Sequence, residues 1–175
     1  MSIEENKRTL GPLGPDPVFR RIRLLCCDVD GVLTDGGLYF DRNGIAMLRF
    51  HVRDGHGLKS VMAAGIEICF ISQSRNEIIS ARATALGVRH CYTGVDDKLE
   101  PVLELARRGG YGLDSVCHIA DDLNDLTLLR AVGVAVTVPS SCLEVRQHCH
   151  FMTSADGGRG AVRELCDAIL VSWDL

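Results

Sequence analysis

The sequence of 175 residues has no apolar run approaching the roughly 20 residues that a membrane-spanning helix needs. It has no block of lysine or arginine, and its formal net charge is −4. Binding to nucleic acid or to a membrane surface is therefore not expected. Internal repeats and low-complexity tracts are also absent. With 46% hydrophobic and 24% charged residues, the composition is that of an ordinary globular domain.

The eight cysteines form no Cys-x-x-Cys pair. Five of them lie in or beside apolar runs, where a free cysteine behaves as a small hydrophobe: Cys26, Cys27, Cys69, Cys91 and Cys117. We therefore expect reduced thiols and a cytoplasmic protein. Residues 1–20 are polar, contain three prolines and lack the apolar segment of a signal peptide. They are expected to form a flexible arm before a single domain over residues 21–175.

Strand and helix patterns alternate from residue 22 almost to the end of the chain. Short apolar runs predict strands over residues 22–27, 66–71, 88–92, 116–120 and 134–138. Helical patterns lie between and after them, over residues 55–64, 76–86, 98–108, 123–131 and 160–171. This alternation predicts βαβ units, and hence a three-layer, Rossmann-like α/β fold with a parallel sheet.

One insertion, at about residues 36–51, interrupts the alternation. Residues 37–40 and 46–51 flank Asp-Arg-Asn-Gly, and Asn-Gly is a strong hairpin signal. The hairpin carries many apolar side chains for a solvated flap: Leu38, Phe40, Met47, Leu48 and Phe50. An isolated hairpin is marginally stable in water. We expect burial against another subunit, and hence an oligomer, with packing on the hairpin's own domain as the alternative.

Residues 28–35, Asp-Val-Asp-Gly-Val-Leu-Thr-Asp, directly follow the first predicted strand. Ligands of open α/β sheets bind at the edge where the strands end. On an ideal strand Asp28 and Asp30 would share a face and repel one another. A cation beside them would relieve the repulsion, and oxygen ligands favour Mg²⁺. The alternative is that Asp-x-Asp-Gly is simply a turn.

Three further polar segments follow strands or begin helices. Ser72, at the end of the second strand, has a hydroxyl that can bind a phosphate oxygen, although serine also commonly caps helices. Lys98 begins a predicted helix, where its charge opposes the helix dipole. Residues 121–125 place three carboxylates after the fourth strand, and helix capping explains only one of them.

The order and spacing of these segments resemble the haloacid dehalogenase (HAD) superfamily of phosphotransferases. The chain most resembles its capless family of 3-deoxy-D-manno-octulosonate (KDO) 8-phosphate phosphatases. The matching motifs are residues 28–35, Ser72, Lys98 and residues 121–125. Two family-level segments also match, Phe-His-Val-Arg-Asp-Gly at residues 50–55 and Gly-Gly-Arg-Gly-Ala-Val-Arg-Glu at residues 157–164. The resemblance covers the chain from about residue 22 to residue 170.

The resemblance implies a reaction through an aspartyl-phosphate. Asp28 would be the nucleophile. Asp30 would protonate the leaving sugar oxygen and then deprotonate the attacking water. Mg²⁺ would be held by the Asp28 carboxylate, the Asp30 backbone carbonyl and Asp121. An anionic nucleophile can approach an anionic phosphate only if positive charge lies between them, so the cation is physically required.

The same resemblance gives roles to the remaining motif residues. Ser72 and Lys98 would bind the transferring phosphoryl group, whose charge is spread over its equatorial oxygens. Asp122 and Asp125 would orient Lys98 and the water shell of the metal.

The resemblance further implies a protein without a cap domain, active in lipopolysaccharide biosynthesis. It would be a homotetramer in which a neighbour's hairpin and C-terminal segment cover each active site. The residues expected to contact a carboxylated sugar are His51, Arg53, Asp54, Gly55, Lys59, Ser74, Arg82 and Arg159.

Two positions depart from the family pattern. Family members carry Thr-Gly-Arg, and relatives acting on nine-carbon acids Thr-Gly-Glu, where this chain has Ser72-Gln73-Ser74. Ala120 stands where glycine usually precedes the Asp pair, and we expect metal binding to survive the added methyl group. The expected substrate is the phosphate monoester of a 3-deoxy-2-keto sugar acid, with KDO 8-phosphate first. The alternatives are a nonulosonic acid 9-phosphate, or a catalytically weak oligomerisation module like the C-terminal domain of vertebrate CMP-sialic acid synthetases.

Overall fold

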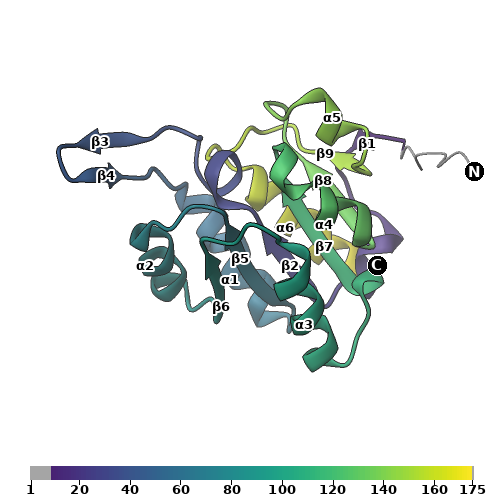
Figure 1. The fold of residues 1–175 in the computed structure, drawn as a ribbon. Coiled ribbons are helices and arrows are strands. Elements are labelled where there is room, and N and C mark those ends of the chain that lie inside the picture. Colours follow the sequence, from purple (N-terminus) through teal and green to yellow (C-terminus); the bar gives the residue numbers. More distant parts are fainter. Residues whose placement is uncertain (1–8, 175) are drawn as a thin grey trace, which may run out of the picture.

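The structure is a computed structural model that describes residues 9–174. Its main sheet has seven parallel strands in the order β1-β9-β8-β7-β2-β5-β6 (Figure 1). These strands are β1 (Gly11–Pro12), β2 (Leu24–Cys27), β5 (Glu67–Ser72), β6 (His90–Thr93), β7 (Val116–Ala120), β8 (Val134–Thr137) and β9 (Phe151–Met152). The helices are α1 (Val52–Ala63), α2 (Glu77–Leu86), α3 (Leu99–Gly109), α4 (Leu126–Ala131), α5 (Leu143–Arg146) and α6 (Ala161–Asp174).

Helices cover both faces of the sheet. Successive residues of a strand point to opposite faces, and β2 is buried on both. Its Leu25 and Cys27 pack in one core with α1 and α6, whereas Leu24 and Cys26 pack in a second core with α3 and α4. The predicted three-layer α/β fold with a parallel sheet is confirmed.

The predicted elements are present, with shifted ends. The strand over residues 116–120 has the predicted bounds, while the segment expected as a helix over residues 123–131 divides into a 3₁₀ turn (Leu123–Asp125) and α4. The two-residue strands β1 and β9 and the four-residue α5 were not predicted, because segments this short show no hydrophobic period. Among the described residues, none of the helices combines the length and apolarity that crossing a membrane requires.

Residues 1–20 were expected to form a flexible arm. Residues 1–8 lie outside the described part of the chain, and for the second half of the segment the prediction is wrong. Gly11–Pro12 pairs with β9. A 3₁₀ turn (Pro17–Arg21) places Phe19, which is fully buried, in the core beside α1 and α6. Trp173 Nε1 donates to the Phe19 carbonyl oxygen at 2.9 Å. An aromatic anchor and a hydrogen bond to α6 therefore hold this segment against the domain.

The predicted insertion is an antiparallel hairpin of β3 (Tyr39–Asp41) and β4 (Gly44–Met47), which projects from the body of the molecule (Figure 1). It is shorter than expected, because the chain after Met47 returns to the domain. There Leu48 and Phe50 pack against the core, as the alternative proposed. Leu38, Phe40 and Met47 are exposed in the single chain.

The chain order around β2 creates a crevice. From β2 the chain continues to β5 and β6 on one side of the sheet, then crosses to β7, β8 and β9 on the other. Such a switch point leaves the carboxyl ends of the neighbouring strands open to a ligand. Asp28 directly follows β2, Ser72 is the last residue of β5, and residues 121–125 directly follow β7.

Candidate active site

The chain turns sharply after β2. Asp28 is the first residue beyond the strand, and a helical turn (Val29–Leu33) follows it. Within this turn Gly31 has φ +87°, a left-handed conformation that favours glycine. A Cβ atom on Gly31 would lie 2.0 Å from Oδ2 of Asp121. Glycine is therefore required both for the turn and for the close approach of the acidic segment after β7.

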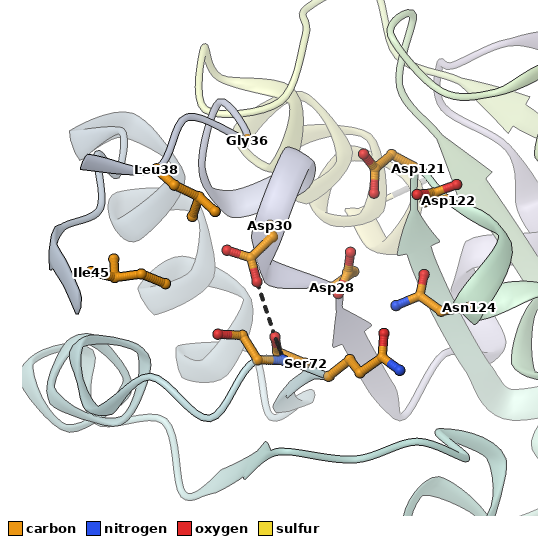
Figure 2. A pocket seen from close by; sticks show the side chains of 11 residues that line it. Asp28, Asp30, Gly36, Leu38, Ile45, Ser72, Asp121, Asp122 and Asn124 are labelled. Atoms are coloured by element: carbon orange, nitrogen blue, oxygen red, sulfur yellow. Dashed lines mark hydrogen bonds between the residues drawn. The ribbon is translucent and has the colours of Figure 1, made fainter. Parts of the chain in front are cut away.

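A pocket of about 470 Å³ opens at this edge of the sheet (Figure 2). Asp28 lies at its centre, with Asp30 towards the hairpin side and Asp121 on the opposite side. The residues that line it are Asp28, Asp30, Gly36, Leu38, Ile45, Ser72, Gln73, Ser74, Asp121, Asp122 and Asn124. Four of these are aspartates, and none of the described lining residues is basic, so the pocket surface itself is acidic.

The last residue of β5 contacts Asp30. The buried Ser72 donates from Oγ to Oδ2 of Asp30 at 3.1 Å, drawn dashed in Figure 2. The same Oγ accepts the backbone N–H of Ser74 at 3.0 Å, so the hydroxyl and the loop hold each other in place. Arg75 lies with its aliphatic chain over Gly94 and is not a lining residue.

Lys98 is buried behind Asp28. Its Nζ donates to Oδ1 of Asp28 at 2.7 Å and to both carboxylate oxygens of Asp125 at 2.8 Å. Only 2% of the Lys98 surface is exposed. Burial alone lowers the pKa of Lys98, but the charges of Asp28 and Asp125 outweigh it, and the net pKa is raised. Lys98 is therefore a fixed ammonium ion beside the carboxylate of Asp28.

The charge of Lys98 alone does not balance the negative charges of the carboxyl groups around Asp28 and Asp121. Burial, reinforced by the charge of Asp125, raises the pKa of Asp28 well above its usual range, although Lys98 opposes this. Burial likewise raises the pKa of Asp121 to about 6, and the charges of Asp125 and Asp122 add to the effect. Oδ1 of Asp121 is buried and has no hydrogen-bond partner among residues 9–174. A second cation at this point would stabilise both ionised groups.

These donors fit Mg²⁺. Magnesium typically takes one or two carboxylates and completes its octahedral shell with waters and substrate phosphate. In the part of the chain that the structure describes, no three His, Cys, Asp or Glu residues group as a complete metal cage. Asp28, Asp121 and the backbone carbonyl of Asp30, with oxygen donors only, suit the hard cation with its open positions.

Most of the residues expected to contact the sugar acid lie elsewhere in the single chain. Gly55, Lys59 and Arg82 line a separate cavity of about 190 Å³ between α1 and α2. Arg82 also lies over the ring of Phe50, with 5.5 Å between its Cζ and the ring centroid. Arg53 and Arg159 are exposed, and neither lines the pocket of Asp28. Of this predicted group, only Ser74 belongs to the pocket.

His51 and Asp54 lie between α1 and α6. Asp54 is buried, and its Oδ1 accepts the backbone N–H of Arg163 at 2.8 Å, in the first turn of α6. Burial raises its pKa. Nδ1 of His51 and Oδ2 of Asp54 are buried without partners among the described residues.

The sequence patterns missed several residues of the site. Gln73 and Asn124 line the pocket, and both adjoin motif residues that were singled out. Leu38 and Ile45 enclose it on the hairpin side (Figure 2). His118, fully buried on β7, contacts Asp125 with 2.7 Å between Nε2 and Oδ1. A histidine inside an otherwise apolar strand was the available signal for it.

The parallel sheet, the two carboxylates after β2, and the serine, lysine and acidic segment around them define a HAD-type hydrolase. Comparisons with known proteins narrow this class, although no protein-family model matches the chain. The KDO 8-phosphate phosphatase KdsC of Yersinia pestis is 39% identical over 166 residues, or 94% of this chain and 89% of that protein. The chain belongs to the KdsC family of 3-deoxy-D-manno-octulosonate 8-phosphate phosphatases.

Solved structures agree with this assignment. The KDO 8-phosphate phosphatase of Moraxella catarrhalis, crystallised with a magnesium ion, a phosphate ion and KDO, is similar with a TM-score of 0.87. It is 35% identical, and the match covers 90% of each chain. A HAD superfamily hydrolase of Legionella pneumophila, 42% identical, also has a TM-score of 0.87, over 90% of this chain and 86% of that one.

Proposed function

We propose that this protein is a Mg²⁺-dependent phosphatase that hydrolyses KDO 8-phosphate to KDO and inorganic phosphate. The observation that carries the proposal is the contact of a buried lysine with Asp28, beside an Asp121 carboxylate oxygen that has no partner in the described part of the chain. Family membership supports the substrate, since the Yersinia pestis relative is named for this phosphatase and the Moraxella catarrhalis structure holds magnesium, phosphate and KDO.

Asp28 is assigned as the nucleophile. Because Lys98 engages Oδ1, attack on phosphorus is assigned to Oδ2. The new O–P bond forms as the bond between phosphorus and the sugar oxygen breaks, leaving an aspartyl-phosphate. Asp30 gives the sugar oxygen its proton. It then takes a proton from the water that attacks phosphorus and releases phosphate, which regenerates Asp28.

The other site residues stabilise charge on the transferring group. Lys98, fixed by Asp125, offers an ammonium ion at the nucleophile, and Ser72 offers a hydroxyl at the edge of the pocket. Mg²⁺, held by Asp28, Asp121 and the Asp30 carbonyl, supplies positive charge to the phosphate oxygens. Asp122 caps the turn after Asp121 by accepting the Leu123 N–H at 2.8 Å, which positions the acidic segment.

A second copy of the chain completes the sugar site in this proposal. The described residues that line the pocket offer no basic side chain to a sugar carboxylate, whereas Arg53, Lys59 and Arg159 are exposed elsewhere on the surface. The exposed apolar hairpin residues Leu38 and Phe40 give a reason to associate. We propose a capless homotetramer in which such cationic residues of one subunit face the pocket of another.

The alternative functions are less well supported. The relatives act on the eight-carbon acid, so a nonulosonic acid 9-phosphate is not favoured. The complete set of Asp28, Asp30, Lys98 and Asp121 also argues against a merely structural module. A role in lipopolysaccharide biosynthesis and a cytoplasmic location belong to the proposal, and the eight free thiols support that location.

A substrate panel tests this function. The purified protein is assayed for phosphate release from eight- and nine-carbon 2-keto acid phosphates and from simple sugar phosphates, with and without Mg²⁺. We expect metal-dependent hydrolysis with the highest kcat/KM for KDO 8-phosphate. A higher kcat/KM for a nine-carbon substrate would reassign the substrate, and no release from any ester would refute the enzyme.

A further inference from the structure

A fourth buried polar residue extends the row of contacts behind Asp28. His118 lies in the middle of β7, paired in register with Cys26 of β2 and Ala135 of β8. Its side chain is fully buried, on a strand whose other residues are apolar or small. A buried imidazole costs stability unless its nitrogens are hydrogen-bonded, so its contacts are informative.

Both ring nitrogens of His118 face oxygen atoms. Nε2 lies 2.7 Å from Oδ1 of Asp125, and Nδ1 lies 3.2 Å from the backbone oxygen of Cys26. A carboxylate and a carbonyl can only accept hydrogen bonds, so the ring is the donor at Nε2. The strand backbone thus fixes the imidazole, and the imidazole fixes Asp125.

Asp125 in turn holds Lys98. Its two carboxylate oxygens both accept from Nζ at 2.8 Å, and Nζ donates to Asp28 at 2.7 Å. All four side chains, from His118 to Asp28, are at most 4% exposed. Among the described residues, His118 is the only hydrogen-bond partner of the Asp125 carboxylate besides Lys98. Without the donor on His118, the plane of this carboxylate would no longer be fixed.

We propose that His118 is a positioning residue for the phosphatase reaction, whose Nε2–H orients Asp125 so that Lys98 is held beside Asp28. The proposal rests on the proposed function of the site. His118 does not touch the pocket, and it acts through two other side chains. Its loss should therefore lower kcat, because the ammonium ion is misplaced, and leave KM for the sugar ester nearly unchanged.

Two substitutions distinguish the effect of losing the hydrogen-bond donor from the effect of losing the volume of the imidazole ring. In His118→Gln the amide nitrogen can take the place of Nε2 and donate to Asp125. In His118→Asn the shorter amide can reach only the position of Nδ1, facing Cys26. We expect His118→Asn to lower kcat by about 10–100-fold with KM within about threefold of wild type. His118→Gln should retain at least about tenfold more activity than His118→Asn, because it restores the donor.

The assay uses KDO 8-phosphate at saturating Mg²⁺, with thermal unfolding of each variant as the check on folding. Equal loss of kcat in the Asn and Gln variants, or a folded His118→Asn enzyme with kcat within about threefold of wild type, would overturn the proposal. If His118→Asn does not fold, His118→Phe takes its place, since it keeps a ring without a donor. Asp28→Asn is assayed in parallel. If that variant is inactive and His118→Asn is fully active, only the role of His118 fails; if Asp28→Asn is active, the proposed function fails.

Discussion

The Asp28 carboxylate accepts a hydrogen bond of 2.7 Å from Nζ of Lys98, seventy positions further along the chain. The two side chains are 4% and 2% exposed, so the contact is formed away from bulk water. An ammonium ion held there can stabilise charge that develops on the transferring phosphoryl group, and such fixed charges are usually the largest contribution to catalysis.

Replacing Lys98 should affect both stability and rate. Lys98→Met keeps the length of the side chain but leaves Asp28 and Asp125 buried without their shared cation. Breaking a buried ion pair in this way typically costs about 3–5 kcal/mol of unfolding free energy. Loss of the charge should lower kcat by at least about 100-fold. Denaturant unfolding and steady-state kinetics measure the two effects.

The matched control is Arg107→Met, which removes an exposed cation that pairs with exposed Glu104 on α3. Its stability should stay within about 0.5 kcal/mol of wild type, as is usual for surface positions. A Lys98→Met enzyme as active and as stable as this control would contradict the role of Lys98.

The affinity of the protein for Mg²⁺ should decrease as the pH is lowered. The pKa of Asp121 in the metal-free protein is raised to about 6 by burial and neighbouring charge, and Mg²⁺ binds the ionised form. Above pH 6 the Asp121 carboxylate is already ionised, so its titration no longer changes the affinity. Below it, protons compete, and the Kd for Mg²⁺ should rise by up to about tenfold for each pH unit. Calorimetric titration at several pH values measures this.

The same titration with Asp121→Asn should show a Kd at least about tenfold higher and a weaker dependence on pH near 6. Asp114→Asn, at an exposed aspartate before β7, is the control and should behave as wild type. An Asp121→Asn protein that bound Mg²⁺ with wild-type affinity would exclude Asp121 as a ligand.

Gly31 offers a test of the geometry after β2. In Gly31→Ala, the left-handed backbone is strained and the new Cβ meets Asp121 Oδ2. Gly65→Ala is a matched control, because Gly65 has φ +92° but no atom within 4 Å of an added Cβ. Both variants should lose about 1 kcal/mol or more of stability. Only Gly31→Ala should also lose activity, by at least about tenfold, since it alone displaces Asp121. Equal activity in the two would show that the close approach is unimportant.

A substitution in the hairpin tests the proposed homotetramer. Light scattering after size exclusion should give the wild-type protein about four times the 19.1 kDa mass of one chain. Phe40→Ser, at a side chain that is 66% exposed in the single chain, should shift the protein to smaller species and lower kcat/KM. Leu143→Ser, at an equally exposed leucine on α5, should change neither quantity. A wild-type protein that is monomeric at micromolar concentration would refute the tetramer.

The sequence allowed the strands, and the polar residues at their carboxyl ends, to be predicted. The apolar run of residues 116–120 became β7 with its predicted bounds, and the polar residues directly after β2, β5 and β7 meet in one pocket because parallel strands end at one edge. Lys98 was placed by its position at a helix start. These signals are local in the sequence, and a small set of rules for connecting strands and helices is enough to place them in the fold.

The failures depend on contacts between distant segments. Nothing local shows that Phe19 is covered by α6, whose Trp173 lies 154 positions away. The family resemblance named Arg53, Lys59 and Arg82 as contacts of the sugar acid. It could not show that Lys59 and Arg82 line a separate cavity in the single chain, because their place depends on how α1 and α2 pack. His118 was hidden inside an apolar run, where its partner Asp125 could not be seen.

The most direct test of the account is turnover of KDO 8-phosphate by Asp28→Asn at saturating Mg²⁺. The amide keeps the shape of the side chain and an oxygen for Lys98 but cannot form the aspartyl-phosphate. We expect a folded protein with kcat lowered by at least about 1,000-fold. A folded variant that keeps a substantial fraction of wild-type turnover would contradict it.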